Sequence, residues 1–383
     1  MKIVHVFSAA QSAYHFMDKQ FEFMHNKGCE IHVIIPNDNY FSKKFIEREK
    51  YVKTYFIPIK RKVSLFFDLI SLLALFFLFK KIRADIIHLH NPKASLLGSI
   101  AARLLLHKKI IYQMHGLVSA SGNTPKKNIV YYFEKATCKL ATKIFAVSWS
   151  LRQFAIDNNY CAADKIEVIG NGTINGIDFE CKFNPEKTGK NDKYIKKETI
   201  QNKFVIGFVG RINCDKGIKD YLEVFKYLIN KIPILGIIVG TNESGKDFNS
   251  LLEHYNLSLN TENLLIYNHV FDPQNIMCHF DVLLFPTKRE GFGLVAAEAN
   301  SLKIPVVAYN IPGVKDAVEN NVTGTLVEYG NIEALSTAVL EYYQNPLKKI
   351  HHGVNGRERI KILFSQKFLW NEIYTAYNKI YTN

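Results

Sequence analysis

The sequence has 383 residues, 48% of them hydrophobic, and a formal net charge of +14 at pH 7. Its length exceeds one ordinary core, so we expect two domains, and its apolar content excludes an intrinsically disordered chain. Six scattered cysteines without a CxxC spacing argue against a disulfide framework or a structural zinc site. The N-terminus has a strand pattern and no signal-peptide core, so the sequence predicts a protein of the cytosol.

The positive charge is concentrated in one part of the chain. Residues 51–150 contain 16 Lys and Arg against 3 Asp and Glu, whereas residues 201–383 contain 18 of each kind. This asymmetry predicts that one face of the N-terminal half meets an anionic partner. Nucleic acid and acidic lipid headgroups are the two candidates.

Short buried strands are predicted through the first half of the chain, with segments between them that are long enough for helices. Alternating strands and helices are typical of a doubly wound parallel sheet. We expect strands at 2–7, 30–36, 84–90, 109–115, 143–148 and 165–170, and helices at 15–27, 66–82, 93–106 and 128–141.

A second series of strands follows a polar, lysine-rich stretch at 181–203, which is predicted to be a connection. The fold class expected is therefore α/β, with Rossmann-like domains at 1–180 and 204–365 and a site in the cleft between their strand ends. The second series of strands is expected at 204–210, 235–240, 264–270, 281–286, 305–310 and 324–329.

Residues 63–79 form the most apolar run of the chain. A membrane-spanning helix needs about 20 apolar residues, whereas this run has 17 and contains Asp68, so a span is not expected. Two interpretations stay open: a helix packed on the sheet before strand 84–90, or a helix lying in a membrane interface. The basic residues that flank the run are Lys60, Arg61, Lys62, Lys80 and Lys81.

The segment KREGFGLVAAEAN places two glutamates, Glu290 and Glu298, around a glycine-containing turn. A strand that ends at a turn and leads into a helix leaves free backbone N–H groups, which suit an anion such as diphosphate. Gly291 and Gly293 let a ligand approach closely, and Glu298 could accept hydrogen bonds from vicinal hydroxyls. An ordinary helix start with solvated acids is the alternative.

A second segment, GFVGRINCDKG, strengthens the interpretation as an anion site. It places Gly210, Arg211, Lys216 and Gly217 where the first strand of the second domain ends. A guanidinium offers a planar fork of donors and an ammonium a point charge, and both suit diphosphate oxygens. Two such strand ends in one domain favour a nucleotide-type ligand.

At these residues the chain resembles the retaining glycosyltransferases of family 4, which have the GT-B fold. The resemblance depends on Glu290 and Glu298 at the E-x7-E spacing, on the GR and KG pairs within 210–217, and on GVKDAVENNVTGTLVEYGN. In the last segment Asp316 stands where the family more often has Glu. The resemblance covers essentially the whole chain and is strongest from 204 to 331.

The resemblance implies a donor site for a nucleotide sugar, with UDP as the expected nucleotide. Arg211 and Lys216 would hold the diphosphate, Glu298 the ribose, and Glu290 the transferred sugar. The implied donor site comprises Gly210, Arg211, Lys216, Val270, Glu290, Gly291, Phe292, Gly293, Leu294, Val295 and Glu298. It also implies that a C-terminal helix at 366–383 returns to the first domain, although a helix on the second domain is the alternative.

His115 stands where the family has a histidine that faces the donor sugar from the first domain. A histidine at a strand end can equally be structural, and His90 is a second candidate of the same kind. The chain has AAQSAYHF where many relatives have a Gly-Gly turn, an opening that occurs in members that extend lipid-linked oligosaccharides. Ser12, Tyr14 and His15 are therefore candidates for the acceptor side.

The expected chemistry is metal-independent transfer with retention. No Asp-x-Asp occurs in the sequence, so neither a metal nor another cofactor is expected. In the family, retention is described as front-face attack, with the leaving-group phosphate helping to take the acceptor proton. The resemblance implies catalytic roles for Arg211, Lys216 and His115, and a positioning and electrostatic role for Glu290. Cations aimed at the leaving diphosphate would stabilise the transition state, and domain closure would exclude water.

The leading hypothesis is a transferase peripheral to the inner face of the membrane, acting on a lipid-linked glycan in capsule, O-antigen or exopolysaccharide synthesis. The basic region 51–150 would face anionic lipid. A soluble acceptor, a catalytically silent nucleotide-sugar binder and a nucleic-acid binder are the alternatives. The last lacks a recognisable binding module with interleaved aromatics, so no nucleic-acid partner is expected.

Overall fold

The computed structural model describes residues 1–60, 64–121, 124–125, 128–189, 194–258, 261–268 and 270–382. Several predicted features extend beyond this set. The residues outside it are Arg61 and Lys62 of the basic flank, Val63 of the apolar run, Lys126 and Lys127 of the basic region, 190–193 of the connection, His269 of the strand expected at 264–270 and Asn383 of the C-terminal helix. The chain forms two compact units. One comprises Met1–Gly176 with Gln366–Asn383, and the other comprises Ile177–Ser365.

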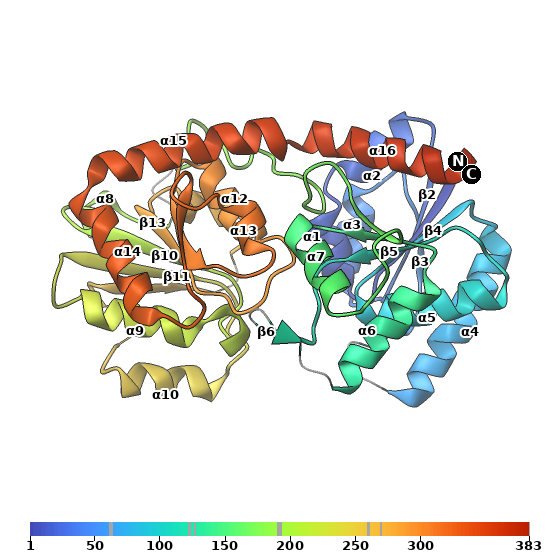
Figure 1. Ribbon diagram of the computed structural model, residues 1–383, viewed down its shortest axis with the longest axis horizontal. Coiled ribbons are helices and arrows are strands. Elements are labelled where there is room, and N and C mark those ends of the chain that lie inside the picture. Colours follow the sequence, from blue (N-terminus) through green and yellow to red (C-terminus); the bar gives the residue numbers. More distant parts are fainter. Residues whose placement is uncertain are drawn as a thin grey trace. The chain divides into compact units, whose positions relative to one another are not determined.

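The first unit is a seven-stranded sheet with helices on both faces (Figure 1), in the order β3-β2-β1-β4-β5-β8-β9. All six strand pairs are parallel. Its elements are β1 (Lys2–Val6), α1 (Ala10–Phe16), α2 (Gln20–Asn26), β2 (Glu30–Ile35), α3 (Phe41–Arg48), β3 (Lys53–Phe56), α4 (Leu65–Ile82), β4 (Ile86–His90), α5 (Pro92–Leu104), β5 (Ile110–Met114), β6 (Ala120–Ser121), β7 (Thr124–Pro125), α6 (Ile129–Leu140), β8 (Lys143–Ala146), α7 (Trp149–Asp157), β9 (Ile166–Val168) and α16 (Gln366–Thr382).

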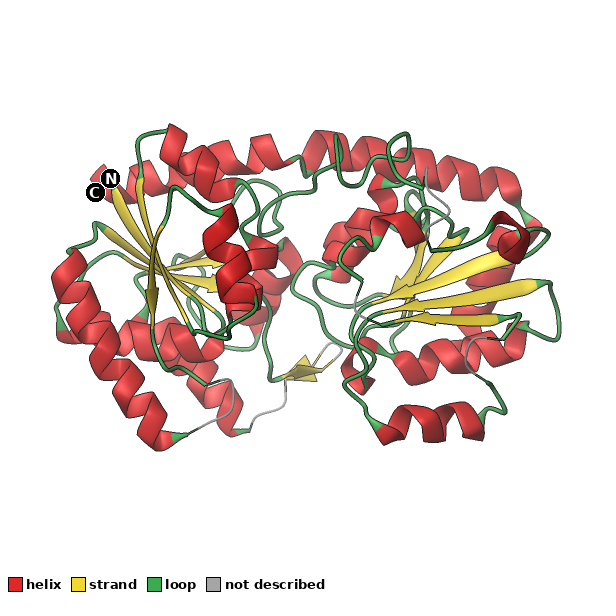
Figure 2. Ribbon diagram, turned by 180° about the vertical axis from the view of Figure 1, so that it is seen from behind, coloured by secondary structure: helices red, strands yellow, loops and turns green. Residues whose placement is uncertain are grey.

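The second unit is a six-stranded parallel sheet, in the order β12-β11-β10-β13-β14-β15, again between helices (Figure 2). Its elements are α8 (Lys197–Ile200), β10 (Phe204–Val209), η1 (Cys214–Lys216), α9 (Ile218–Leu228), β11 (Ile234–Val239), α10 (Lys246–His254), β12 (Leu264–Tyr267), α11 (Gln274–Met277), β13 (Val282–Phe285), α12 (Leu294–Ser301), β14 (Val306–Tyr309), α13 (Val314–Ala317), β15 (Gly324–Val327), α14 (Ile332–Gln344) and α15 (Pro346–Leu363).

The predicted fold class is confirmed, because both units are doubly wound parallel sheets. Two local predictions differ from the structure. The single helix expected at 15–27 is two helices, α1 and α2, because Lys19 adopts a left-handed conformation with φ of 59° between them. The edge strand β3 was not predicted, because its half-exposed residues lack the continuous apolar pattern of the buried strands.

The segment that begins at Ile177 is held on the second unit by a buried arginine. Arg357 of α15 donates to the backbone oxygens of Ser301 at 2.7 Å, Phe183 at 3.3 Å and Phe179 at 3.4 Å. Ser301 Oγ also donates to the Phe183 oxygen at 2.8 Å. Much of the stretch expected as a connection is therefore packed on the second unit.

Helix α16 completes the core on one face of the first sheet. Leu369, Ile373 and Tyr377 pack among buried residues of α1, α2 and the strands, and Figure 1 shows α16 beside α2. Helices α4, α5 and α6 cover the opposite face, where Leu75 and Phe79 of α4 are buried.

Candidate active site

The order of strands in the second sheet defines its ligand-binding edge. β10 pairs with β11 on one side and with β13 on the other, so the connections leave β10 and β13 in opposite directions. In doubly wound sheets, ligands bind at the carboxyl ends of strands at this switch point. Loop 210–217 after β10 and loop 286–293 after β13 both begin there.

An ion pair joins these two loops. The Nζ of Lys216 donates to Oε1 of Glu290, and Thr287 Oγ1 donates to the same oxygen at 3.1 Å. The Lys216 and Glu290 side chains are 21% and 14% exposed, so the pair is partly desolvated and yet open to a ligand. The structure thus brings together one cation and one carboxylate that the sequence analysis singled out separately.

Gly217 allows the two loops to approach so closely. Its φ is +76°, and a Cβ at this position would lie 1.9 Å from the carbonyl oxygen of Pro286. Asn213 caps the preceding turn by accepting from the Lys216 N–H at 3.0 Å. The glycine of the KG pair therefore has a steric role, and it sets the place from which Lys216 reaches Glu290.

Two further contacts fix the backbone around Glu290. Arg289 forms a 2.7 Å ion pair with Asp215 of the facing loop. A Cβ on Gly313, which has φ of +86°, would lie 2.8 Å from the Glu290 carbonyl oxygen, so the α13 segment packs directly on this turn. The segment around Asp316 therefore supports the position of Glu290 from behind.

Helix α12 begins at the same edge of the sheet. Gly293, with φ of 79°, is its N-cap and has no side chain to bond the first N–H groups of the helix. Leu294 and Val295 are partly exposed, whereas Gly291 and Phe292 are buried. Because the first N–H groups of a helix have no partners within it, this terminus suits an anion.

Arg211 and Glu298 are the two other predicted donor-site residues that carry charge. Arg211 forms a 2.8 Å ion pair with Glu243, which also accepts from Asn213 Nδ2 at 3.1 Å. Glu298 is partly exposed on α12, and desolvation raises its pKa to about 7, while the positive charge of Lys182 acts in the opposite direction. Gly210 follows β10, and Val270 follows β12, which is separated from β10 in the sheet by β11.

The switch point of the first sheet lies between β1 and β4. Asn91 follows β4 and links the two strand ends, accepting from the Ser8 N–H at 3.2 Å and donating to Ser12 Oγ at 3.4 Å. Its backbone has φ of 65° and ψ of 146°, a region that residues other than glycine rarely occupy. Such strain persists only where surrounding contacts impose it, which marks Asn91 as a candidate site residue.

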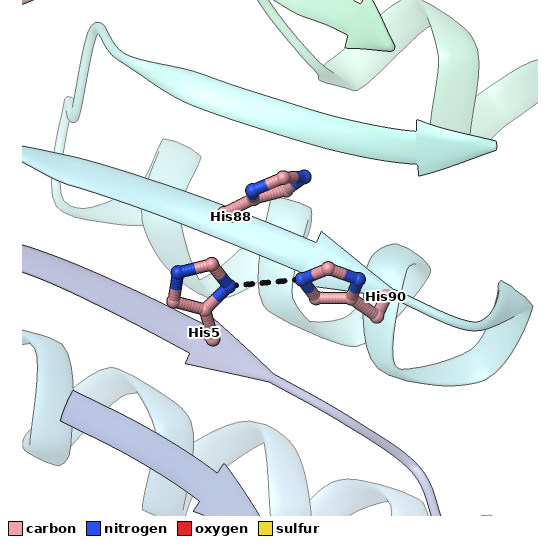
Figure 3. A group of neighbouring side chains, drawn as sticks. All are labelled: His5, His88 and His90. Atoms are coloured by element: carbon pink, nitrogen blue, oxygen red, sulfur yellow. Dashed lines mark hydrogen bonds between the residues drawn. The ribbon is translucent and has the colours of Figure 1, made fainter. Parts of the chain in front are cut away.

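Four histidines lie on β1 and β4 and directly after β5. His5 of β1 and His88 and His90 of β4 gather within the sheet (Figure 3), and His5 Nδ1 lies 3.0 Å from His90 Nε2. His90 Nδ1 lies 3.2 Å from Nε2 of His115, which follows β5. His115 is partly exposed and stacks on Phe16 at 5.2 Å between ring centroids.

Burial keeps these imidazoles uncharged near neutral pH. Desolvation lowers the pKa of His5 and of His115 to about 3. It also lowers the pKa of His88 and of His90 well below the ordinary value, and the neighbouring histidines add to that effect. The site in this unit is therefore lined by neutral hydrogen-bonding groups.

His88 uses both of its ring nitrogens in hydrogen bonds to residues other than these histidines. Gln113 Nε2 donates to the Phe145 oxygen at 3.1 Å, so its Oε1 accepts from His88 Nε2–H at 3.1 Å. The other nitrogen, Nδ1, then accepts from the Tyr377 hydroxyl at 2.6 Å. His88 thereby connects helix α16 to the interior of the sheet.

The acceptor-side candidates from the sequence separate into two groups. Ser12, His90 and His115 lie at the strand ends, where contacts link them through Asn91 and Phe16. Tyr14 packs against α3, with the Arg48 guanidinium 4.4 Å from its ring centroid. His15 lies against Phe41 of the same helix, at 5.4 Å between ring centroids.

Several residues of the two strand edges were not predicted. Glu243, Thr287 and Asn213 provide partners for the predicted cations and carboxylate, and only the three-dimensional contacts reveal them. Asn91 and His5 had a possible signal. Polar residues within apolar strands, as in KIVHV and IIHLHNP, are unusual enough to indicate a buried network.

Comparisons with known proteins agree with this geometry. Residues 21–174 match the family described as Glycosyltransferase Family 4, and residues 190–359 match Glycosyl transferases group 1. A capsular polysaccharide biosynthesis glycosyltransferase, CapM of Staphylococcus aureus, is 34% identical over 98% of this chain and 97% of its own length. The chain belongs to the family 4 glycosyltransferases.

Another relative and a solved structure extend the comparison. The UDP-Gal:alpha-D-GlcNAc-diphosphoundecaprenol alpha-1,3-galactosyltransferase of Escherichia coli is 30% identical to this glycosyltransferase, over 84% of this chain and 82% of the relative. Anabaena HepE, solved with UDP and glucose, superposes with a TM-score of 0.81 at 19% identity, over 99% of this chain and all of HepE. The structural likeness confirms the GT-B fold.

Proposed function

We propose that this glycosyltransferase moves a hexose or N-acetylhexosamine from a UDP-linked donor to a lipid-linked glycan, during assembly of a bacterial surface polysaccharide such as capsule. The observation that carries the proposal is the Lys216–Glu290 pair at the switch point, beside the N-terminus of α12. A cation, free N–H groups and a carboxylate at one strand edge suit a diphosphate joined to a sugar.

The relatives support the choice of substrates. The E. coli relative is named for a UDP-linked galactose donor and a diphosphoundecaprenol acceptor, and CapM is named for capsular polysaccharide biosynthesis. HepE has been solved with UDP and with UDP-glucose. These names describe those proteins, and they make UDP and a lipid diphosphate the first ligands to test.

The proposed mechanism uses charge at the leaving group. As the sugar–phosphate bond breaks, negative charge grows on the diphosphate, and Lys216, Arg211 and the α12 N-terminus stabilise it. Removing one such donor typically lowers the rate by about 10²–10³-fold. Glu290 positions the transferred sugar and faces the cationic sugar centre. We propose retention of configuration and no metal requirement.

A thermal-shift screen tests the donor site. Wild type is measured with UDP, GDP, ADP and dTDP, beside Lys216→Ala and the matched control Lys231→Ala. Lys231 is exposed after the far end of α9, so its loss removes the same charge away from the site. Stabilisation by UDP that is lost only in Lys216→Ala supports the proposal. Equal stabilisation in all three proteins contradicts it.

The first unit has an exposed apolar surface that suits a membrane interface. Helix α4 buries Ser71, Leu75, Phe79 and Ile82, but its other side presents Leu65 at 85% exposure, Phe66 at 69%, and Leu69, Leu73 and Phe77 at 50% or more. We call these five exposed side chains the α4 apolar face. No described helix has the length and apolar content needed to cross a membrane.

Charge and position support the same interpretation. Lys80 and Lys81 are exposed at the C-terminal end of α4. Asp68, the acid within the apolar run, is neutralised by Lys93 of α5 at 2.6 Å and accepts from the Ser64 N–H at 3.1 Å. Because α4 follows a parallel strand, it begins at the sheet edge where His90 and His115 lie. A lipid-held acceptor would therefore meet the first unit at that edge.

Vesicle flotation tests this surface. We expect wild type to float with vesicles containing anionic phosphatidylglycerol, less strongly at high salt, and a Leu65→Ser/Phe66→Ser variant to remain unbound. The matched control Leu347→Ser/Ile350→Ser removes two exposed apolar residues of α15 in the other unit. Equal flotation of all three proteins would contradict the assignment of this surface to a membrane.

The acceptor is tested by a separate activity assay. Activity of wild type on a water-soluble acceptor that equals its activity on a lipid-linked acceptor would contradict the proposed acceptor.

A further inference from the structure

A line of three imidazoles runs from the interior of the first sheet to its ligand-binding edge. His5 Nδ1 contacts His90 Nε2 at 3.0 Å, and His90 Nδ1 contacts His115 Nε2 at 3.2 Å. A neutral imidazole has one N–H donor and one bare acceptor nitrogen. His90 therefore donates through one nitrogen and accepts through the other, and the whole line has only two possible directions.

In the outward direction His5 donates to His90 and His90 donates to His115, which leaves the proton of His115 on Nδ1. In the inward direction His115 donates from Nε2, and the proton of His5 ends on its Nε2. That Nε2 is buried and has no hydrogen-bond partner among the described residues. The inward direction would leave a buried N–H without an acceptor, whereas the outward one leaves only an unpaired acceptor, and buried N–H groups are seldom left unpaired.

We propose that His90 and His5 are positioning residues that fix the proton of His115 on Nδ1, so that Nδ1–H donates to a hydroxyl oxygen of the transferred sugar. Nδ1 and Nε2 flank Cε1 and point in different directions, and Nε2 is hydrogen-bonded to His90. The only nitrogen that His115 can offer to a ligand is then a donor. This inference rests on the proposed function and on the family resemblance, which implies that His115 faces the donor sugar.

The arrangement suits the charge that develops in the reaction. The transferred sugar becomes cationic as its bond to phosphate breaks, so an imidazolium beside it would raise the barrier. A neutral ring with a fixed N–H binds a sugar hydroxyl without adding positive charge. A donor that is already oriented also avoids reorganisation during the reaction. The buried histidines thus specify both the charge and the direction of a single hydrogen bond.

A metal ion is the competing explanation for clustered histidines. His5, His88 and His90 each have one nitrogen within 4.8 Å of the others (Figure 3). Both nitrogens of His88 and of His90, and one of His5, already make hydrogen bonds. A metal would need bare nitrogens and would displace several of these bonds, so the line of hydrogen bonds explains the cluster better.

The tautomer of His115 can be measured directly by NMR on protein with ¹⁵N-labelled histidine. Long-range ¹H–¹⁵N correlation distinguishes a protonated ring nitrogen from a bare one, and the His115 signals are assigned by their loss in His115→Gln. We expect the proton of His115 on Nδ1 in wild type. A proton on Nε2 would overturn the proposal without any further variant. Metal retained stoichiometrically after EDTA dialysis would overturn it as well.

The variant His5→Phe tests whether the line transmits the effect. His5 is buried at the far end of the line from His115, so the substitution acts on His115 through His90. We expect a mixture of His115 tautomers and a fall in kcat/KM for the donor sugar of up to about tenfold, the effect of one hydrogen bond. UDP affinity should not change, because UDP lacks the transferred sugar that His115 is proposed to contact.

The matched control is His88→Phe, which removes an equally buried imidazole that is outside the line. It should leave the His115 tautomer as in wild type. An unchanged His115 tautomer in His5→Phe, or an equal change in both variants, would overturn the inference. If wild type does not bind UDP, the proposed donor fails, and the NMR result still decides the tautomer.

Discussion

At the switch point of the second sheet, between β10 and β13, the side chains that meet are charged. Lys216 pairs with Glu290, Arg211 pairs with Glu243, and the N-terminus of α12 lies beside them. At the switch point of the first sheet, between β1 and β4, the groups are neutral: the imidazole of His90, the amide of Asn91 and the hydroxyl of Ser12. Six strands follow the same order in the two sheets, and yet the side chains at the two switch points differ in charge.

The difference matches the ligands proposed for each edge. The proposed nucleoside diphosphate is negatively charged, and the fixed cations and N–H groups at the switch point of the second sheet suit it. The transferred sugar and the glycan of the proposed acceptor carry hydroxyls, for which neutral donors and acceptors suffice. The excess positive charge of residues 51–150 instead includes Lys80 and Lys81, exposed on α4. We propose an anionic membrane surface as the partner of these two lysines.

The largest expected effect comes from removing the negative charge of Glu290 at the switch point of the second sheet. Glu290→Gln should lower kcat/KM for glycosyl transfer by about 10²–10³-fold while UDP still binds, because Glu290 is proposed to face the sugar and not the nucleotide. Steady-state kinetics and calorimetry with UDP separate the two effects. The control Glu243→Gln disrupts an exposed ion pair and should change kcat/KM by less than about fivefold.

Loss of UDP binding in Glu290→Gln, in step with activity, would contradict this division of roles. It would mean that the carboxylate serves only to hold Lys216 in place. A larger loss in Glu243→Gln than in Glu290→Gln would shift the centre of the site toward Arg211.

The next effect concerns the close approach of the two loops. Gly217→Ala places a Cβ 1.9 Å from the Pro286 oxygen, so loop 210–217 must move and Lys216 with it. We expect about 100-fold lower kcat/KM, as for other small misplacements of a catalytic group. Gly245→Ala is the matched control, because Gly245 also has positive φ but no atom lies within 4 Å of its Cβ position. Equal activity in the two variants would show that steric contact at Gly217 is unimportant.

The same contrast explains which parts of the molecule the sequence could predict. Apart from β3, the strands of both sheets follow from short apolar runs, and Glu290, Arg211 and Lys216 follow from motifs with a characteristic spacing. Edge strand β3 and the break at Lys19 could not be predicted from such runs, because one is half-exposed and the other depends on a single φ angle.

Contacts between residues far apart in the sequence could not be predicted, for a different physical reason. His5 and His90 are 85 residues apart, and Lys216 and Glu290 are 74 apart, so their contacts exist only once the strands are in register. At the switch point of the second sheet, the sequence indicated the residues that carry chemistry, because the charged side chains there belong to motifs that can be recognised. At the first edge the chemistry is in buried neutral groups that resemble core residues.

A smaller effect is expected on stability at the first edge. Asn91 has φ of 65° and ψ of 146°, so Asn91→Ala should be less stable than Asn91→Gly by about 1–3 kcal/mol. Urea unfolding of the two variants measures the difference. Asn345, the N-cap of α15 with φ of −125°, is the control, because glycine is preferred to alanine at any N-cap. A difference at Asn91 no larger than at Asn345 would exclude backbone strain.

The smallest effect is a pH dependence at the second edge. Desolvation raises the pKa of Glu298 to about 7, and we expect its ionised form to be the one that accepts from the ribose hydroxyls of the proposed donor. UDP affinity should therefore fall as pH drops below 7, approaching about tenfold per pH unit, and calorimetry from pH 5.5 to 8 measures this. Glu298→Gln should bind UDP weakly and with no such dependence.

Folding stability responds to the same carboxyl group with the opposite sign. The pKa of Glu298 in the folded chain is raised from an ordinary value of 4.5, so the folded state holds its proton more tightly than the unfolded state. Stability without ligand is therefore highest below pH 4.5 as far as this group is concerned, and it decreases as pH rises toward 7. At pH 8 Glu298→Gln should be more stable than wild type and yet bind UDP less well. A variant that is both less stable and unchanged in UDP affinity would assign Glu298 to packing and remove it from the donor site.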